Sequence, residues 1–153
     1  MIRDDAAEAL GQAEFFDICD EEQRRMLAFA SDMHQFDPDA VLYKAGDTPQ
    51  GAFVLVEGTL KAKPEGPGAA KPYAISEPGS VVSAMALILS KPRPVTVTAV
   101  TECRALFVPR TAFLKLVQQS PDLAQRAVAR VERDLGNYLG ALEPVRRKMK
   151  AGE

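Results

Sequence analysis

Gly79-Ser-Val-Val-Ser-Ala-Met-Ala-Leu-Ile-Leu-Ser-Lys-Pro-Arg-Pro-Val-Thr-Val97 is the stretch of sequence that decides the fold. A glycine turn leads into small residues and an apolar helical turn, and a Lys-Pro-Arg-Pro loop then leads into an alternating strand. The first turn of a helix has backbone N–H groups without intrahelical partners, which can bind an anion such as phosphate. Arg93 follows the predicted helix, and its planar guanidinium could close over that anion. The stretch therefore predicts an anion site.

This stretch resembles the phosphate-binding cassette of the cyclic nucleotide-binding domain family, the sensor domain of catabolite activator-type regulators. The residues that match are Val82-Ser83-Ala84-Met85-Ala86-Leu87 and Pro92-Arg93-Pro94-Val95-Thr96-Val97, with the spacing of the family between them. The resemblance implies a non-catalytic, signal-sensing regulatory domain. It also implies that a cyclic nucleotide, or another small phosphorylated ligand, would lie against Val82, Ser83, Ala84, Met85, Arg93, Pro94, Val95 and Thr96.

The cassette departs from the family pattern at several positions. Ala84 stands where the family has a glutamate that binds the ribose, and Ser83 stands where it has a glycine. Pro94 has no N–H to give to the phosphate. Loss of the glutamate and of this N–H would weaken binding by a factor of about 30 to 1,000. Val95, in place of a small alanine, would fill part of the sugar space. We expect weak or absent cAMP and cGMP binding, and a protein-interaction or dimerisation scaffold without a ligand is the alternative.

Composition places the chain among ordinary globular proteins. Its 153 residues are 46% apolar and 26% charged, which predicts a single domain over 1–153. The net charge of −2 gives no support for nucleic-acid binding. Two cysteines, Cys19 and Cys103, are too few for a thiolate metal centre and suit a reducing cytoplasm. Because no apolar run has the length of a signal peptide or a membrane span, we expect a cytoplasmic protein that binds no membrane.

The N-terminal residues 4–31 are predicted to be helical. Asp20 can cap a helix over Glu21–Ala30, with Gln23 as the reciprocal partner of a capping box. The predicted apolar face of this helix consists of Met26, Leu27 and Ala30, and the residues expected to pack beneath it are Phe15, Phe16 and Ile18.

Residues 33–108 consist of short apolar runs separated by turn residues, which is typical of a β-sandwich or jelly roll. The predicted strands are Met33–Phe36, Val41–Lys44, Ala52–Glu57, Thr59–Lys63, Pro72–Ser76, Val95–Val100 and Arg104–Val108. Gly46 and Gly58 stand where the family carries turn glycines, and the need for a positive φ explains them. Pro64–Lys71 is expected to be a loose hairpin tip. The predicted fold is mainly β, a double-stranded β-helix (jelly-roll) sandwich with N-terminal helices and a long C-terminal helix.

Helices are predicted to return over residues 111–149. Thr111 is expected to cap a short helix through Gln118 whose inward side chains are Phe113, Leu116 and Val117, and Ser120-Pro121-Asp122 signals the start of the next helix. That helix carries a heptad-like seam, which Pro144 ends or kinks near Glu143. The resemblance implies a homodimer through this seam, at Val128, Val131, Leu135, Tyr138 and Leu142, continuing to Val145 and Met149. The alternative is that the seam packs on its own domain.

Catalytic and DNA-binding functions find little support in the sequence. The only histidine, His34, is interpreted as structural, which disfavours a metal-dependent jelly-roll enzyme, and no nucleophile or acid–base pair stands out. The basic residues Arg146, Arg147, Lys148 and Lys150 are expected to complement a helix dipole in solvent. Many family members continue into a helix-turn-helix domain, and none is expected here because the sequence stops at Glu153.

Overall fold

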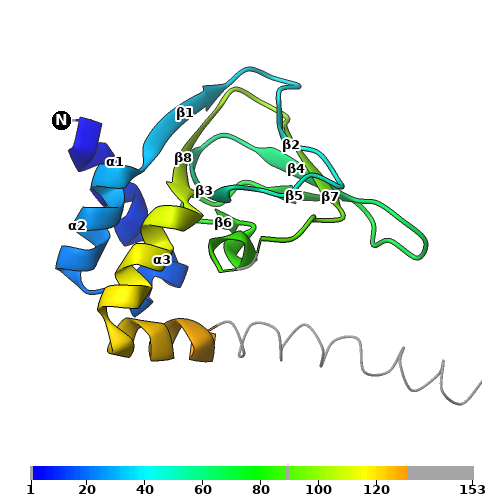
Figure 1. The fold of residues 1–153 in the computed structure, drawn as a ribbon. Helices are drawn as coiled ribbons and strands as arrows, with labels where there is room; N and C mark the ends of the chain where they lie inside the picture. The colour runs from blue at the N-terminus through cyan, green and yellow to red at the C-terminus, as the bar shows by residue number, and fades with distance from the viewer. Residues whose placement is uncertain (1, 89, 131–153) are drawn as a thin grey trace, which may run out of the picture.

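Two four-stranded antiparallel sheets form the body of the molecule, with helices packed on one of them (Figure 1). A computed structural model describes residues 2–88 and 90–130, with no account of the side chains of residues 2–4 and 85. One sheet has the strand order β1-β8-β3-β6 and the other has the order β2-β7-β4-β5. The predicted fold class, a mainly β jelly roll with flanking helices, is confirmed.

The elements follow one another as a helical start, a run of strands and a helical end. The helices are α1 (Ile2–Gln12), η1 (Glu14–Ile18), α2 (Glu21–Ala30), η2 (Ala84–Leu87) and α3 (Arg110–Gln119), and residues 121–130 are also helical. The strands are β1 (Asp32–Phe36), β2 (Val41–Tyr43), β3 (Gly51–Glu57), β4 (Leu60–Pro64), β5 (Tyr73–Ile75), β6 (Val81–Val82), β7 (Val95–Ala99) and β8 (Cys103–Pro109).

The predicted capping box at the start of α2 is confirmed. The Gln23 N–H donates to Asp20 Oδ1 at 2.7 Å, and the Asp20 N–H donates to Gln23 Oε1 at 2.9 Å. The predicted apolar face is wrong at Met26 and Ala30, which are exposed, whereas Leu27 and Ala28 are buried. Arg24 donates to the carbonyl oxygen of Phe16 in η1 and to that of Cys19, so the side of α2 that carries Arg24 faces inward.

Strand alternation divides the core into two parts. One face of the sheet β1-β8-β3-β6 packs against the helices through Ala52, Val54, Leu106 and Val108, together with Leu10, Phe16, Leu27 and Phe113. The opposite face looks into the sandwich, where the buried residues are Leu55, Leu60, Ala62, Val82, Val97, Ala99 and Cys103. Successive side chains of a strand point to opposite faces, so β3 supplies both parts of the core.

One strand and the start of one helix differ from the sequence prediction. Strand β6 was missed because two residues are too few to show alternation; it pairs with β3 through Phe53↔Val82 and Val54↔Val81. Thr111 does not cap α3, because β8 continues to Pro109, the helix begins at Arg110, and no side chain caps it. The predicted cap at Ser120 is confirmed, since the Leu123 N–H donates to Ser120 Oγ at 3.2 Å.

The remaining predictions concern surface positions. Val128 is 56% exposed, whereas the other seam residues, Pro144 and the basic residues from 146 onward lie outside the described residues. His34 is exposed on β1, with its ring 6.1–6.2 Å from those of Phe36, Phe53 and Phe107. In the part of the chain that the structure describes, no helix has the length and apolarity needed to cross a membrane.

Candidate functional site

The cassette turn is tighter than the sequence indicated. Ser83 has φ +61°, a left-handed conformation that favours glycine, and the Ala86 N–H donates to the Ser83 carbonyl at 2.9 Å. The helix that follows is a 3₁₀ turn of four residues, Ala84–Leu87. So short a turn has few aligned peptides to sum into a helix dipole, and the anion site expected at its N-terminus stays a prediction.

A small pocket of about 100 Å³ lies where this turn meets the sheet β2-β7-β4-β5. Strand register places four residues in a row across that sheet, in the order Tyr43, Val97, Ala62 and Tyr73. The row ends in two tyrosines and has smaller side chains between them. The complete lining is Tyr43, Ala62, Tyr73, Ile75, Val81, Val82, Ser83, Arg93, Val95 and Val97.

Tyr43 closes one side of this pocket. Its hydroxyl forms a hydrogen bond with Ser83 Oγ, which ties β2 to the cassette turn. Burial raises the pKa of the Tyr43 phenol, and the opposing effects of the Ser83 hydrogen bond and of the Arg93 charge are smaller. Tyr43 is therefore a neutral phenol at physiological pH and has one O–H to donate.

Arg93 supplies the positive charge of the pocket. Its backbone is fixed on both sides, since its N–H donates to Asp47 O at 3.1 Å and its carbonyl accepts from the Gly46 N–H at 2.8 Å. The Nε atom of Arg93 is buried and has no hydrogen-bond partner among the described residues. A buried donor without a partner carries a desolvation penalty that an anionic ligand would remove.

The sequence-predicted site residues divide between several surroundings. Val82, Ser83, Arg93 and Val95 come together at the small pocket. The Pro94 carbonyl accepts from the Glu65 N–H at 2.8 Å. Thr96 Oγ1 accepts from the Ala45 N–H at 2.9 Å, so this hydroxyl joins β7 to the turn that follows β2. The side chain of Met85 lies outside the described residues.

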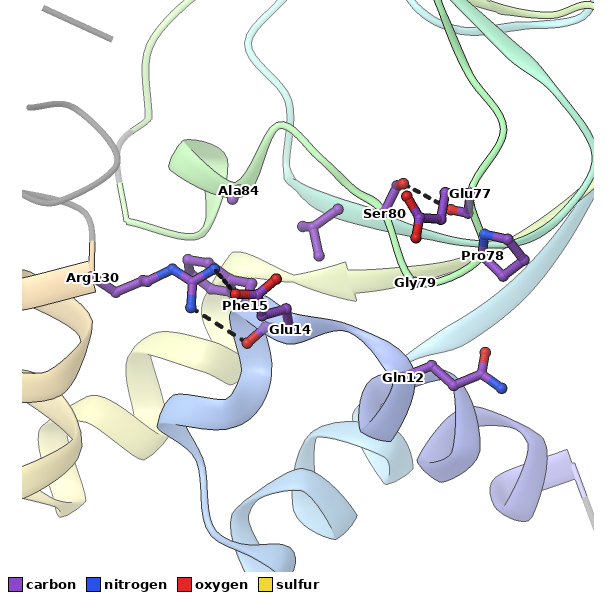
Figure 2. Close-up of a pocket in the computed structure, with 10 residues that line it drawn as sticks. Gln12, Glu14, Phe15, Glu77, Pro78, Gly79, Ser80, Ala84 and Arg130 are labelled. Carbon is purple, nitrogen blue, oxygen red and sulfur yellow. Dashed lines mark hydrogen bonds and ion pairs between the residues drawn. The ribbon is translucent and has the colours of Figure 1, made fainter. Parts of the chain in front are cut away.

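Ala84 lines a second cavity, of about 330 Å³, which lies between the cassette and the helices (Figure 2). Arg130 reaches into this cavity, with Nη2 3.9 Å from Glu14 Oε1 and the guanidinium carbon 5.8 Å from the Phe15 ring centre. The other lining residues are Gln12, Glu77, Pro78, Gly79, Ser80 and Val81. This cavity connects the cassette turn with both the N-terminal helices and the helical residues 121–130.

Sequence reasoning missed Tyr43 and Tyr73 as parts of the pocket. Tyr43 lies in the predicted strand Val41–Lys44 and Tyr73 in the predicted strand Pro72–Ser76, and each was counted only as a strand residue. A usable signal was present, because Tyr73 and Ile75 have the same parity and so share a face of β5. The register that brings Tyr73 and Tyr43 into one row depends on pairings between distant parts of the chain.

Comparison with known proteins agrees with this geometry. The family model described as "Cyclic nucleotide-binding domain" matches residues 33–120, which is more than half of the chain. The HTH-type transcriptional regulator Cmr of Mycobacterium tuberculosis is 29% identical over 105 residues, which are 69% of this chain and 43% of that regulator. The chain therefore spans less than half of that relative's length.

Solved structures share the fold. The cyclic nucleotide-binding-like protein of Brucella abortus superposes with a TM-score of 0.63 at 25% identity, over 74% of this chain and 98% of that one. The regulatory domain of PKA from Toxoplasma gondii, solved with cAMP, superposes with a TM-score of 0.66 at 24% identity, over 84% of this chain and 50% of that one. These structures share the fold, and the family model that matches residues 33–120 shows that the chain belongs to the cyclic nucleotide-binding domain family.

Proposed function

We propose that this chain is a non-catalytic regulatory domain that senses a small ligand beside Arg93 and binds cAMP and cGMP only weakly. The observation that carries the proposal is the pocket itself, which has a buried arginine donor but a volume of only about 100 Å³. Pockets that enclose organic ligands have volumes of about 300–1,000 Å³. A cytoplasmic location, expected from the two free cysteines, is part of the same proposal.

Three local features support weak nucleotide binding. The Tyr43–Ser83 hydrogen bond joins the two sides of the pocket, so a larger ligand would have to break it. Pro94 has no N–H to offer a phosphate. Ala84, at the position of the family's ribose-binding glutamate, lines the other cavity.

A signal from the pocket would reach the helices through the second cavity. Val81 lines both cavities, and Arg130 links the helical residues 121–130 to Glu14 and Phe15 of η1. A ligand that draws Ser83 toward Arg93 would shift the wall that Val81 and Ala84 form. A ligand would raise the population of the state with the shifted wall only in proportion to how much more tightly it binds that state than the unshifted one.

Isothermal titration calorimetry with cAMP and cGMP tests this proposal. We expect dissociation constants of about 1 mM or weaker for the wild type, and no heat of binding for Arg93→Ala. The exposed Arg25 on α2 offers the matched control Arg25→Ala, which should bind as the wild type does. A dissociation constant below about 10 µM, or equal binding by Arg93→Ala, would contradict the proposal.

A dimerisation scaffold is the second candidate, and the exposure of Val128 favours it. The predicted heptad seam begins at Val128, which is 56% exposed and therefore accessible to a partner helix. Sedimentation equilibrium should show a dimer for the wild type and a larger monomer fraction for Val128→Glu. Val100→Glu, at a valine beside β7 that is 49% exposed, is the control. A dimer with a dissociation constant of about 100 µM is the weakest that we consider. A wild-type protein that is fully monomeric at about 100 µM would therefore exclude this candidate.

A further inference from the structure

We propose that two neighbouring cavities beside α1 form a docking surface for a lysine- or arginine-rich segment of a partner protein. The inference goes beyond the proposed function, because it concerns a protein partner and a surface that Arg93 does not line. Its test therefore succeeds or fails independently of nucleotide binding.

The two cavities meet at the end of α1. One is the cavity of about 330 Å³ between the cassette and the helices, and the other has a volume of about 340 Å³. Gln12 and Pro78 line both of them. At this shared edge the turn at Gly79 lies directly on α1, since a Cβ added there would be 2.5 Å from Gln12 O. Pockets of about 300 Å³ or more enclose organic groups, so a segment that crosses the shared edge can place one long side chain in each cavity.

The cavity of about 340 Å³ carries more carboxylates than arginines. Asp5 and Glu8 lie on one face of α1 and line this cavity together with Arg104. Arg104 is already engaged, because its Nη2 lies 4.0 Å from Asp5 Oδ2 and its Nη1 lies 3.7 Å from Glu57 Oε1. Glu8 is exposed and forms no ion pair with any residue that the structure describes. Its carboxylate is therefore available to a cation from outside.

The cavity between the cassette and the helices has the same excess of carboxylates. Glu14 and Glu77 lie on opposite walls, with Arg130 beside Glu14 (Figure 2). Nη2 of Arg130 is 3.9 Å from Glu14 Oε1, so these two charges offset each other. Glu77 is exposed and pairs with no arginine or lysine in the described part of the chain. Each cavity thus contributes one carboxylate without a partner, Glu8 in one and Glu77 in the other.

The chemistry of the lining favours a basic peptide over a metal ion. Among the described residues, no three His, Cys, Asp or Glu side chains are grouped so that they could hold a metal ion. Apolar side chains also line both cavities, Met33 and Val56 in one and Phe15 and Val81 in the other. Lysine and arginine cover apolar surface with their methylene stems while their charged ends stay at the surface. Gln12, at the shared edge, has an amide donor and acceptor for the backbone of such a segment.

A partner bound at this surface would also contact the cassette turn. Ala84 lines the cavity between the cassette and the helices, and Val81 lines both that cavity and the small pocket. Docking would therefore stabilise one position of a wall that the small pocket shares. The partner and a ligand of the small pocket would affect each other's binding only as far as both prefer the same position of that wall.

Fluorescence anisotropy tests the inference, with the full chain and a labelled peptide of about ten residues in which lysine and alanine alternate. We expect a dissociation constant of about 10–100 µM at about 50 mM NaCl, as for a weak and transient interface. Binding should weaken at about 300 mM NaCl, because salt screens exposed ion pairs. A peptide of alternating glutamate and alanine should not bind. No change in the anisotropy of the lysine peptide up to about 1 mM chain, about tenfold above the expected range, would overturn the inference.

Substitution of the two carboxylates without a partner locates the site. Glu8→Gln and Glu77→Gln should each weaken binding of the lysine peptide about twofold to fivefold, because each removes one exposed ion pair. Glu22→Gln on α2 is the matched control, since Glu22 is exposed and lines neither cavity. The double variant Glu8→Lys with Glu77→Lys should lose the lysine peptide and bind the glutamate peptide. Equal weakening by Glu22→Gln, or a double variant without this exchange of peptides, would indicate attraction to net charge alone and would contradict the inference.

The same assay separates two other occupants of the surface. Spermidine is a linear polycation without a peptide backbone, and full displacement of the peptide by an equal concentration of spermidine would make the surface a polyamine site. The chain's own basic residues are tested with a variant in which Arg146, Arg147, Lys148 and Lys150 are all changed to alanine. Binding of the peptide by that variant but not by the wild type would assign the surface to these residues. Either result overturns the inference, whereas equal binding by this variant and the wild type supports it.

Discussion

Gly58→Ala should be the most destabilising single-methyl substitution at a turn of this domain. Gly58 joins β3 to β4 with φ +99°, a conformation that costs an L-residue about 1–2 kcal/mol. A Cβ there would also lie 2.5 Å from Glu102 O and 2.6 Å from Cys103 Sγ, and the first of these is a backbone atom. Forced overpacking of this kind costs about 1–3 kcal/mol. The sum is a loss of about 2–5 kcal/mol in the free energy of unfolding, against a typical total of about 5–15.

Urea unfolding followed by circular dichroism measures this loss. With a slope of about 2 kcal/mol/M, the midpoint should fall by about 1–2.5 M. Two other glycines separate the causes, because an added Cβ would meet nothing within 4 Å at Gly66, which has φ +111°, or at Gly11, which has no positive φ. Gly66→Ala should lose only the conformational part, and Gly11→Ala in α1 should be neutral or gain up to about 1 kcal/mol. A Gly58→Ala loss no larger than that of Gly66→Ala would refute the packing argument.

Three further predictions concern other parts of the structure. Asp20→Ala removes the capping box of α2 and should lower the free energy of unfolding by about 1 kcal/mol in a thermal melt. Burial raises the pKa of Cys19 from 9.0 to about 11, so between these pH values the folded state keeps a proton that the unfolded state loses. Stability should therefore fall by up to about 2–3 kcal/mol as pH rises from 9 to 11, and urea midpoints of Cys19→Ala should lack this part of the fall. The free energy of unfolding of Ser83→Gly should exceed that of Ser83→Ala by about 1 kcal/mol, because the left-handed φ of +61° suits glycine. Thermal melts of the two variants measure this difference.

Local sequence signals predicted the elements whose causes are local. Asp20 and Gln23 stand three residues apart, and that spacing alone specifies a capping box. The alternation in β3 and β8 is long enough to show both faces of a sheet. The face of α2 was predicted incorrectly because an arginine, Arg24, lies on its inward side, where it binds carbonyl oxygens of the preceding turn. An apolar pattern gives no signal for such a contact.

The site was less predictable because long-range register builds it. Arg93 and Ser83 could be located from the cassette, since both are close in sequence and near turn residues. Tyr43 reaches Ser83 across 40 positions of the chain, and Tyr73 joins the same pocket only through the pairings of β5 with β4 and of β4 with β7. The volume of the small pocket depends on all of these side chains at once. Ala84, in place of the family's glutamate, could therefore suggest weaker nucleotide binding from the sequence, but it could not predict the pocket volume.

The stability of the fold and the closure of the small pocket depend on different residues in this domain. An added Cβ at Gly58 would lie 2.5 Å from the backbone oxygen of Glu102, so this position contributes to the stability of the fold. Ser83, in contrast, holds a strained φ and forms a hydrogen bond with Tyr43 that offsets part of the strain. A net hydrogen bond of about 1 kcal/mol is comparable with the cost of that left-handed residue, so the site can be closed by two side chains at little cost to the fold. The same near balance means that breaking the Tyr43–Ser83 bond to open the pocket should cost only about 1 kcal/mol.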